Sequence, residues 1–325
     1  MTATQISYLT FGIVLLVALI FDFGLFSKKN TVVTIKSAFY QSIFWVAISL
    51  AFCIFLFFED GSKVATKFLT AYLMEKSLSI DNIFVFILIF ASFKIKESDT
   101  GRVLLIGILL AIIFRIIFIA IGIELIERFH WILYIFGVFL IYTGYKLFFK
   151  KDEDEFNPRE SKLYRFIRKY LRLTTVEPNG KYIIKRSGKV YFTTLSIAVF
   201  MLAAIDIVFA LDSIPTVVSI VREQAHIPFS PDDVLVIYSS NIFAILGLRA
   251  LFFLLKGAVN KFDFLQQGIA VVLVFIGIKM LIEYFDIHIS IYISLVVIVV
   301  CLAVSIIYSI YHDRKKPEIK PNQID

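Results

Sequence analysis

The sequence predicts an all-α membrane protein, a polytopic bundle of about nine transmembrane helices. Hydrophobic residues make up 59% of its 325 residues and charged residues 18%, whereas soluble domains carry about a quarter charged residues. Apolar runs of about twenty residues recur along the whole chain, and this is the length of a helix that crosses a bilayer. Basic residues gather in the connections between these runs. Together these features exclude a soluble globular domain.

Nine spans are expected in chain order. They cover residues 6–26, 38–58, 64–93, 102–124, 130–149, 190–221, 232–256, 264–284 and 288–311. Segment 1–7 has no Lys or Arg, whereas the connection 150–189 holds twelve of them against six acids. Basic connections stay in the cytoplasm, so the N-terminus is predicted outside and the C-terminus inside. The net charge of +7 then reflects topology, and we expect no nucleic-acid binding.

The connection 150–189 is the one sizeable segment expected outside the membrane. Its first part, an acidic run followed by Pro158, predicts a solvated linker. Apolar and basic residues alternate over 163–170 as they do in an amphipathic helix. This helix would either lie on the anionic inner leaflet or act as a solvated spacer.

No pattern in the chain predicts an enzyme. Walker A, Gly-x-Ser-x-Gly, His-Glu-x-x-His and Cys-x-x-Cys motifs are all missing from the sequence. Cys53 and Cys301 stand in separate apolar runs, which predicts neither a disulfide nor a thiolate metal site. The four histidines show no metal-ligand spacing. We therefore expect no tightly bound cofactor.

Two segments place acidic residues inside apolar runs. Segment 206–215 reads Asp-Ile-Val-Phe-Ala-Leu-Asp-Ser-Ile-Pro, and segment 75–82 reads Glu-Lys-Ser-Leu-Ser-Ile-Asp-Asn. An ionised carboxylate in hydrocarbon costs several kcal/mol unless it is paired, hydrated or bound to a cation. Pro215 removes a backbone donor, which favours a break in the helix near Asp212. We expect the two segments to meet and to hold a cation.

Both acidic segments belong to an internal repeat. Its matching pairs are Glu75 and Asp206, Asp81 and Asp212, Asn82 and Ser213, Arg115 and Arg249, and Lys146 and Lys279. Each copy holds three spans, so the second copy enters the membrane from the opposite side, as in many secondary transporters. The chain then divides into an N-terminal helical hairpin (1–63), repeat 1 (64–149), the basic cytoplasmic loop (150–189), repeat 2 (190–285) and a last helix with its tail (286–325).

The acids and their polar neighbours form a candidate metal site. Positions six apart lie roughly 9 Å apart along a regular helix, so either each helix breaks between its two acids or these acids serve successive positions on a path. The candidate ligands are Glu75, Asp81, Asn82, Asp206, Asp212, Ser213, Asn241 and, near the inner end of the first span, Asp22. Asp22 is equally well interpreted as an ordinary interfacial residue. Oxygen ligands of this kind select Mg²⁺, Ca²⁺ or Mn²⁺.

A competing interpretation uses the basic residues inside the spans. In it the acids only pair with cationic side chains and so hold the bundle together. The cations concerned are Arg115, Arg249, Lys146 and Lys279. We interpret Arg115 and Arg249 as counter-charges or packing clamps rather than as substrate contacts.

Longer motifs carry a resemblance to a known family. Besides the two acidic segments, they are Phe-Asp-Phe-Gly-Leu-Phe at 21–26, Ser-Asn-Ile-Phe-Ala-Ile-Leu-Gly-Leu-Arg-Ala-Leu at 240–251 and Phe-Ile-Gly-Ile-Lys-Met at 275–280. Over nearly its whole length the sequence resembles the TerC family of bacterial integral membrane proteins, which is named for tellurium resistance. The resemblance implies export of Mn²⁺ across the bacterial inner membrane, with Glu75, Asp81, Asp206 and Asp212 carrying the metal. A tellurite oxyanion would instead need cationic ligands.

Two classes of function stay open. A carrier without an ATP site in this chain must use the membrane potential or an ion gradient, and proton antiport suits carboxylates that lose protons when metal binds. The alternative is a membrane scaffold that helps to assemble or metallate other proteins through the loop 150–189. A Ca²⁺ exchanger differs from a Mn²⁺ exporter only in ligand number and cavity size. Expected partners are a divalent cation, membrane lipids, and a second copy or another membrane protein.

Overall fold

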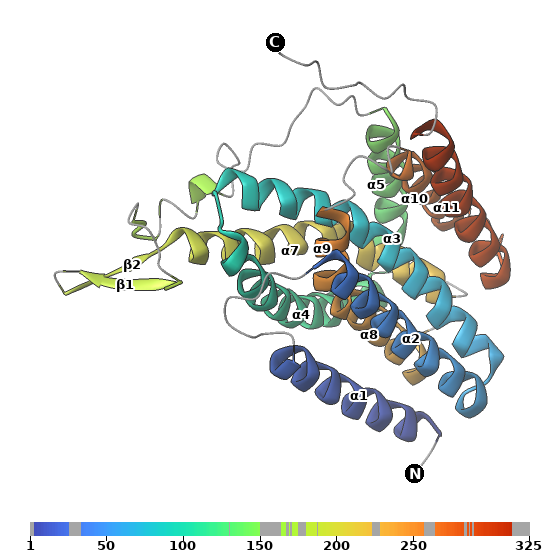
Figure 1. The fold of residues 1–325 in the computed structure, drawn as a ribbon. Coiled ribbons are helices and arrows are strands. Elements are labelled where there is room, and N and C mark those ends of the chain that lie inside the picture. The colour runs from blue at the N-terminus through green and yellow to red at the C-terminus, as the bar shows by residue number, and fades with distance from the viewer. Residues whose placement is uncertain are drawn as a thin grey trace.

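The structure is a computed structural model that describes residues 3–25, 34–129, 131–149, 164–166, 169, 171–174, 180–186, 188–222, 228–256, 264–282, 285, 287 and 289–313. Helices dominate this part of the chain (Figure 1), which confirms an all-α membrane-type fold. They are α1 (Ala3–Leu25), α2 (Ile35–Glu59), α3 (Ser62–Ser92), α4 (Glu97–Arg128), α5 (Ile132–Phe148), α7 (Thr194–Val221), α8 (Pro231–Leu246), α9 (Leu248–Lys256), α10 (Leu265–Ile282) and α11 (Ile291–Asp313). A small hairpin of β1 (Ile183–Arg186) and β2 (Lys189–Phe192) precedes α7.

Polar contacts tie helix ends together at one end of the bundle, which we call the latch end. There the starts of α1, α3 and α8 meet the ends of α2 and α4. The hydrogen bonds run from Thr4 Oγ1 to Asp232 Oδ1 (2.9 Å), from Ser7 Oγ to Asp60 Oδ2 (2.6 Å), from Lys67 Nζ to Asp233 Oδ1 (2.7 Å) and from the Phe229 amide to Glu127 Oε1 (3.2 Å). Helices α1 to α4 therefore alternate in direction, as the spans of a membrane bundle do.

The opposite end of the bundle carries the β-hairpin, and we call it the hairpin end. Here Lys256 Nζ, at the end of α9, donates to Glu97 Oε1, at the start of α4 (2.8 Å). The guanidinium of Arg102 lies 5.9 Å from the centre of the Tyr182 ring, which stands just before β1. The Thr193 amide before α7 donates to the Tyr182 carbonyl (3.0 Å). The hairpin is thus fixed to the starts of α4 and α7.

Two parallel helix pairs form the centre of the bundle. Helices α3 and α8 both start at the latch end, whereas α4 and α7 both start at the hairpin end. The contacts run in the same order along both members of a pair: Lys67 with Asp233 and Lys76 with Ala244 for α3 and α8, and Gly107 with Leu202 and Gly122 with Ile214 for α4 and α7. Consequently α3 and α7, the first helices of the two proposed repeats, start at opposite ends.

Helices α5 and α10 approach so closely that their contact leaves no room for larger side chains. A Cβ on Gly277 would lie 2.6 Å from the carbonyl oxygen of Gly137, and a Cβ on Gly144 would lie 2.7 Å from that of Ala270. Since Gly137 meets Gly277 while Gly144 meets Ala270, the two helices run antiparallel. Helix α11 packs along α10 on the same side of the bundle (Figure 1).

Helix α7 bends at the point where the sequence predicts a break. The axes of Thr194–Ala210 and Ser213–Val221 differ by 40°. Pro215 cannot donate an amide hydrogen to the carbonyl of Leu211, and its ring crowds that carbonyl. The helix nevertheless continues to Val221. The expected interruption is therefore a bend within one helix.

The expected span 232–256 agrees with a stretch, Pro231–Lys256, that is long and apolar enough to cross a membrane, and it consists of two consecutive helices, α8 and α9, separated at Gly247. A Cβ at this position would lie 2.7 Å from Lys76 Nζ and 3.1 Å from Trp45 Cβ. Lys76 Nζ donates to the carbonyl of Ala244 (3.2 Å), near the end of α8. Carbonyls in the last turn of a helix lack partners within the helix. The interruption between α8 and α9 thus leaves room for the ammonium group of Lys76 and supplies it with a carbonyl acceptor.

The β-hairpin was not expected from the sequence, which predicted only a linker and one amphipathic helix over 150–189 and a span from residue 190. Instead, Ile183 pairs with Phe192 and Arg186 with Lys189, and α7 begins at Thr194. Gly188, at the turn, has a φ of +73°, which glycine adopts without strain. The basic residues of the two strands lie at the turn and are exposed, whereas Tyr191 and Phe192 are half-buried, so the tip of the hairpin is a small charged projection.

Residues 164–166 and 169 of the expected amphipathic helix are helical. Tyr164 lies against the core, with its ring 5.5 Å from the ring of Phe93, whereas Phe166 is exposed. The remaining residues of this predicted helix lie outside the described residues. The described part therefore packs partly on the bundle itself.

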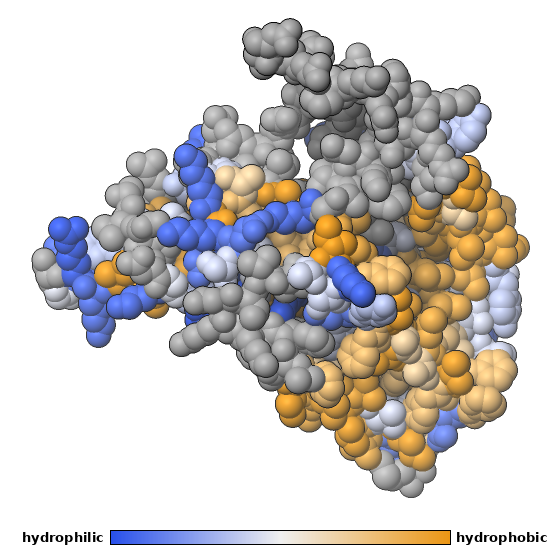
Figure 2. All heavy atoms as spheres, viewed as in Figure 1, coloured by the Kyte–Doolittle hydropathy of each residue, from blue (hydrophilic) through white to orange (hydrophobic). Residues whose placement is uncertain are grey.

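The surface of the bundle is apolar along the helices and hydrophilic at the hairpin end (Figure 2). Among the described residues, five helical stretches have the length and composition of a membrane span, or six if bent α7 counts as one. The five are α1, α2, α4, α8 with α9, and α11, and α10 is apolar but shorter. The chain is a multi-pass membrane protein, and the number of nine spans stays a prediction.

Candidate functional site

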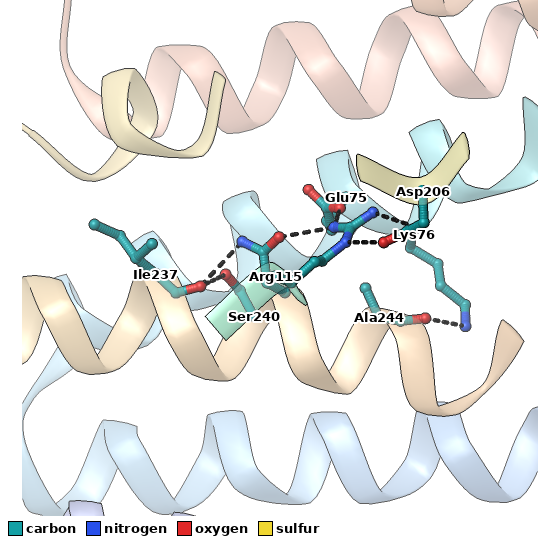
Figure 3. A network of polar contacts seen from close by, with 8 residues as sticks. Glu75, Lys76, Arg115, Asp206, Ile237, Ser240 and Ala244 are labelled. Carbon is teal, nitrogen blue, oxygen red and sulfur yellow. Dashed lines mark hydrogen bonds and ion pairs between the residues drawn. The ribbon is translucent and has the colours of Figure 1, made fainter. Parts of the chain in front are cut away.

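A buried guanidinium lies at the centre of the bundle. Arg115 of α4 is 1% exposed and donates hydrogen bonds to three side chains from three other helices (Figure 3). Its Nε and Nη2 atoms bind Asp206 Oδ2 and Oδ1 of α7 at 2.9 and 3.0 Å. Its Nη1 atom binds Glu75 Oε1 of α3, and also Asn241 Oδ1 of α8 at 2.9 Å. The four central helices therefore meet at one side chain.

Asn241 is oriented for its role as an acceptor. Its Nδ2 group donates to the Ile237 carbonyl one turn earlier in α8 (3.0 Å), which leaves Oδ1 directed at Arg115. Asn241 is fully buried, and the neighbouring Ser239 and Ser240 are buried as well. A helix that turns a polar face toward the bundle interior is a common mark of an ion pathway in membrane proteins.

The charges at this cluster do not balance by themselves. Two carboxylates face one guanidinium, so the ionised cluster carries one net negative charge. The two parallel bonds to Asp206 form the fork geometry that makes arginine a strong carboxylate partner. Glu75 has a single bond to Arg115 instead. The Glu75 carboxylate is thus the less fully satisfied of the two acids.

Buried oxygens without partners lie next to Glu75. Within the described residues, Glu75 Oε2, Ser213 Oγ and Ser79 Oγ have no hydrogen bond. Ser213 is beside the Glu75 carboxylate and is itself buried. Burying a polar atom without a partner costs free energy. These oxygens are of the donor type that Mg²⁺, Ca²⁺ and Mn²⁺ accept.

Comparison with known proteins places the whole cluster in one family. The model of the Integral membrane protein TerC family matches residues 60–317. The chain belongs to the TerC family. The match includes α3 to α11, and therefore every residue of the Arg115 cluster.

Several bacterial relatives are similar over most of their length. A membrane protein of Rickettsia felis without a described function is 42% identical over 279 residues, which cover 86% of this chain and 89% of the relative. One of Myxococcus xanthus is 42% identical over 261 residues, 80% of this chain and 78% of the relative. Alx of Salmonella typhi, named as a candidate membrane-bound redox modulator, is 40% identical over 291 residues, 86% of this chain and 87% of the relative. No solved structure matches the chain.

Three of the eight predicted ligands of this TerC protein contact Arg115, namely Glu75, Asp206 and Asn241. A fourth, Ser213, lies beside Glu75. Asn82 and Ser213 are buried in α3 and α7. The side chains of Asp81, Asp212 and Asp22 lie outside the described residues. Within the described part of the chain, three or more acidic, histidine or cysteine side chains nowhere gather as a metal-binding group.

The described contacts of the basic residues inside the spans go to backbone carbonyls as well as to acids, whereas the competing interpretation expected acids alone. Arg115 is the counter-charge that the competing interpretation assigned to it. Lys279 donates to the carbonyl of Ser219 near the end of α7 (2.8 Å), and Lys146 is exposed. Lys76 was not predicted to matter, yet it is a half-buried cation that follows Glu75 in α3 and donates to the carbonyl of Ala244 in α8 (Figure 3). Its place within the motif Glu75-Lys76, inside an apolar run, was the available signal.

Proposed function

We propose that this TerC protein is a secondary transporter that exports divalent metal cations, foremost Mn²⁺, from the cytoplasm. One observation supports it above the others. Glu75 and Asp206 occupy matching positions of the two sequence repeats, and both reach the same buried point between α3, α4, α7 and α8. Buried acids that come from two repeats and meet at the bundle centre are typical of carriers.

The proposal includes the inverted relation of the repeats. When the first repeat is laid on the second, α3, α4 and α5 correspond to α7, α8 and α10. The parallel pair α3 with α8 then corresponds to the pair α7 with α4, and the α5–α10 contact corresponds to itself. Opposite starting ends for α3 and α7 agree with this symmetry. We infer nine spans in the bacterial inner membrane, with the latch end outside and the hairpin end in the cytoplasm.

The metal pathway in this proposal has two levels. Asp81 and Asp212 are first-choice ligands, together with Asn82 and Ser213, because each acid stands next to a second oxygen donor. Glu75 and Asp206 form the adjacent level at Arg115, with Asn241 as the neutral donor. Asp22 is proposed to attract cations at the mouth of the pathway.

Movement against a gradient needs an energy source outside this chain. Carboxylates that release protons as metal binds make proton antiport the natural coupling. If antiport operates, collapse of the pH gradient in sealed vesicles abolishes uphill metal movement, and unchanged movement rules it out.

A scaffold role is the second candidate, because the structure contains an ordered hairpin, residues 183–192, at the end of the loop 150–189. Replacing residues 181–192 with a Gly-Ser linker separates the two candidates. A carrier keeps most of its metal transport, whereas a scaffold loses its effect on other proteins. Ca²⁺ is the alternative cargo.

The test is the manganese content of cells that lack their own exporter and are challenged with manganese. Cells with empty vector are compared with cells that express the wild type, Asp81→Asn or Asp212→Asn at equal membrane levels. The proposal predicts that the wild type lowers cellular manganese and that both substitutions abolish this effect. If no divalent metal changes despite good expression, transport is excluded.

A further inference from the structure

The Arg115 guanidinium lies between three of the candidate metal ligands, Glu75, Asp206 and Asn241. We propose that Arg115 is a tethered counter-cation that alternates with the transported metal on Glu75. This inference rests on the proposed transport function and extends it. In the structure, Arg115 binds Asp206 through two donors and Glu75 through one. Metal arrival breaks the bond to Glu75 and leaves the stronger fork to Asp206 intact.

Charge explains why the metal and the guanidinium exclude each other at Glu75. A second cation beside Arg115 would be repelled in a region of low effective dielectric constant. The carboxylate offers one occupied oxygen, Oε1, and one oxygen without a partner, Oε2. A divalent ion that takes Oε2 together with Ser213 Oγ weakens the hold of Arg115 on Oε1. The Glu75 side is thus the one from which the guanidinium withdraws.

The withdrawn guanidinium would move toward a small cavity. This cavity lies beside Asp206, is lined by Ile108 and Ala111 of α4, Leu202 of α7 and Ile245 of α8, and has room for about one water molecule, so these side chains must move apart to admit the guanidinium. Ala111 and Ile108 stand one and two turns before Arg115 in the same helix. Helical side chains lean toward the start of their helix. Withdrawal therefore carries the guanidinium toward the hairpin end without loss of Asp206.

The same device explains how a carrier that holds neither metal nor protons returns, a step separate from the proton-loaded return of an antiporter. With the metal gone, Glu75 would be a buried carboxylate without a cation, and this would resist the change of conformation. Arg115 then takes Glu75 again and restores a cluster with the charge seen in the structure. Metal binding requires Arg115 to leave Glu75, and the empty return step requires Arg115 to bind Glu75 again.

Reconstituted vesicles separate these two steps. Net uptake of Mn²⁺ into metal-free vesicles requires the empty return step, whereas exchange of radioactive Mn²⁺ for unlabelled Mn²⁺ does not. For Arg115→Gln we expect a Kd for Mn²⁺ lowered by about tenfold, exchange that persists, and net uptake that is nearly lost. Arg128→Gln, an exposed arginine of the same helix, is the matched control and changes none of the three.

A second variant tests the withdrawn position without touching a charge. Ala111→Leu fills the cavity beside Asp206, so it holds Arg115 on Glu75 and raises the Kd for Mn²⁺. Ala120→Leu, on an exposed face of α4, is its control. Should Arg115→Gln fail to fold, Ala111→Leu and the charge-keeping Arg115→Lys carry the test, and Arg115→Lys is expected to keep net uptake.

The outcomes are distinct. Opposite shifts of Kd in Arg115→Gln and Ala111→Leu, with exchange kept in the first, support the alternation. Loss of both binding and exchange in folded Arg115→Gln, or an unchanged Kd in Ala111→Leu, overturns it and leaves Arg115 a structural clamp while the transport proposal stands. A wild type that neither binds nor moves Mn²⁺ overturns the transport proposal and this inference together.

Discussion

Arg115 and Asp206 form a two-pronged ion pair in the interior of the bundle, with bonds of 2.9 and 3.0 Å. They lie 91 positions apart in the sequence and come from the two copies of the proposed repeat. This pair joins α4 to α7 along their parallel contact. Glu75 and Asn241 then extend the same connection to α3 and α8.

Removal of the guanidinium should destabilise the protein strongly. Arg115→Met leaves two buried carboxylates without a counter-charge, and breaking a buried pair in this way costs about 3 to 5 kcal/mol. We expect a clear loss of thermal stability for the purified protein in detergent. The triple variant Arg115→Met, Glu75→Gln, Asp206→Asn should recover most of it, because no buried charge is left alone. A triple variant as unstable as the single one would contradict this explanation.

The α5–α10 contact should not tolerate a methyl group. In Gly277→Ala the new Cβ would lie 2.6 Å from the Gly137 carbonyl, so the helices must separate. Overpacking of this kind costs about 1 to 3 kcal/mol, measured as a lower midpoint of thermal unfolding. Gly12→Ala in α1 is the control, since no atom lies within 4 Å of its added Cβ. Equal midpoints for the two variants would show that this contact is looser than described.

The ion pair at the latch end should contribute measurably to stability. Lys67 and Asp233 are 10% and 15% exposed in their side chains, so water screens them little. A double-mutant cycle with Lys67→Met and Asp233→Asn should give a coupling of about 1 kcal/mol or more. The exposed Arg128–Glu124 pair within α4 is the comparison and should give a coupling near zero. Similar coupling free energies for the two pairs would show that the Lys67–Asp233 pair stabilises the protein no more than an exposed pair does.

The two ends of the bundle should face opposite sides of the membrane. Ser62→Cys at the latch end and Lys185→Cys at the hairpin are placed in a background in which Cys53 and Cys301 are replaced by serine. A thiol reagent that does not cross membranes should label Ser62→Cys in intact cells and Lys185→Cys only after lysis. Labelling of both in intact cells would contradict the assigned orientation.

Much of the fold follows from patterns that are local in the sequence. Runs of apolar residues gave the helices, and Pro215 gave the bend in α7, because the missing amide acts on the preceding turn. The β-hairpin had a local signal too, in the short runs with β-branched and aromatic residues on either side of Gly188. The many basic residues of the loop instead indicated a solvated connection, so no strand was predicted there.

The partners of the buried charges could not be predicted, because they depend on which helices meet. The sequence identified Glu75, Asp206 and Asn241 as polar residues in apolar runs. Only the packing of four helices brings them to Arg115. The break at Gly247 is similar: its reason is the side chain of Lys76 from another helix, and no feature of segment 232–256 alone indicates it.

The most direct measurement is Mn²⁺ flux into sealed vesicles that contain the purified protein. Three proteins are compared at equal density: the wild type, Glu75→Gln and Glu124→Gln, an exposed glutamate of α4. We expect saturable Mn²⁺ flux for the wild type and Glu124→Gln, and roughly a tenfold or larger loss of flux for Glu75→Gln, because a buried pathway carboxylate is removed. Equal flux in Glu75→Gln and the wild type, or no flux in any of them, would contradict the claim that the buried acids carry a divalent metal.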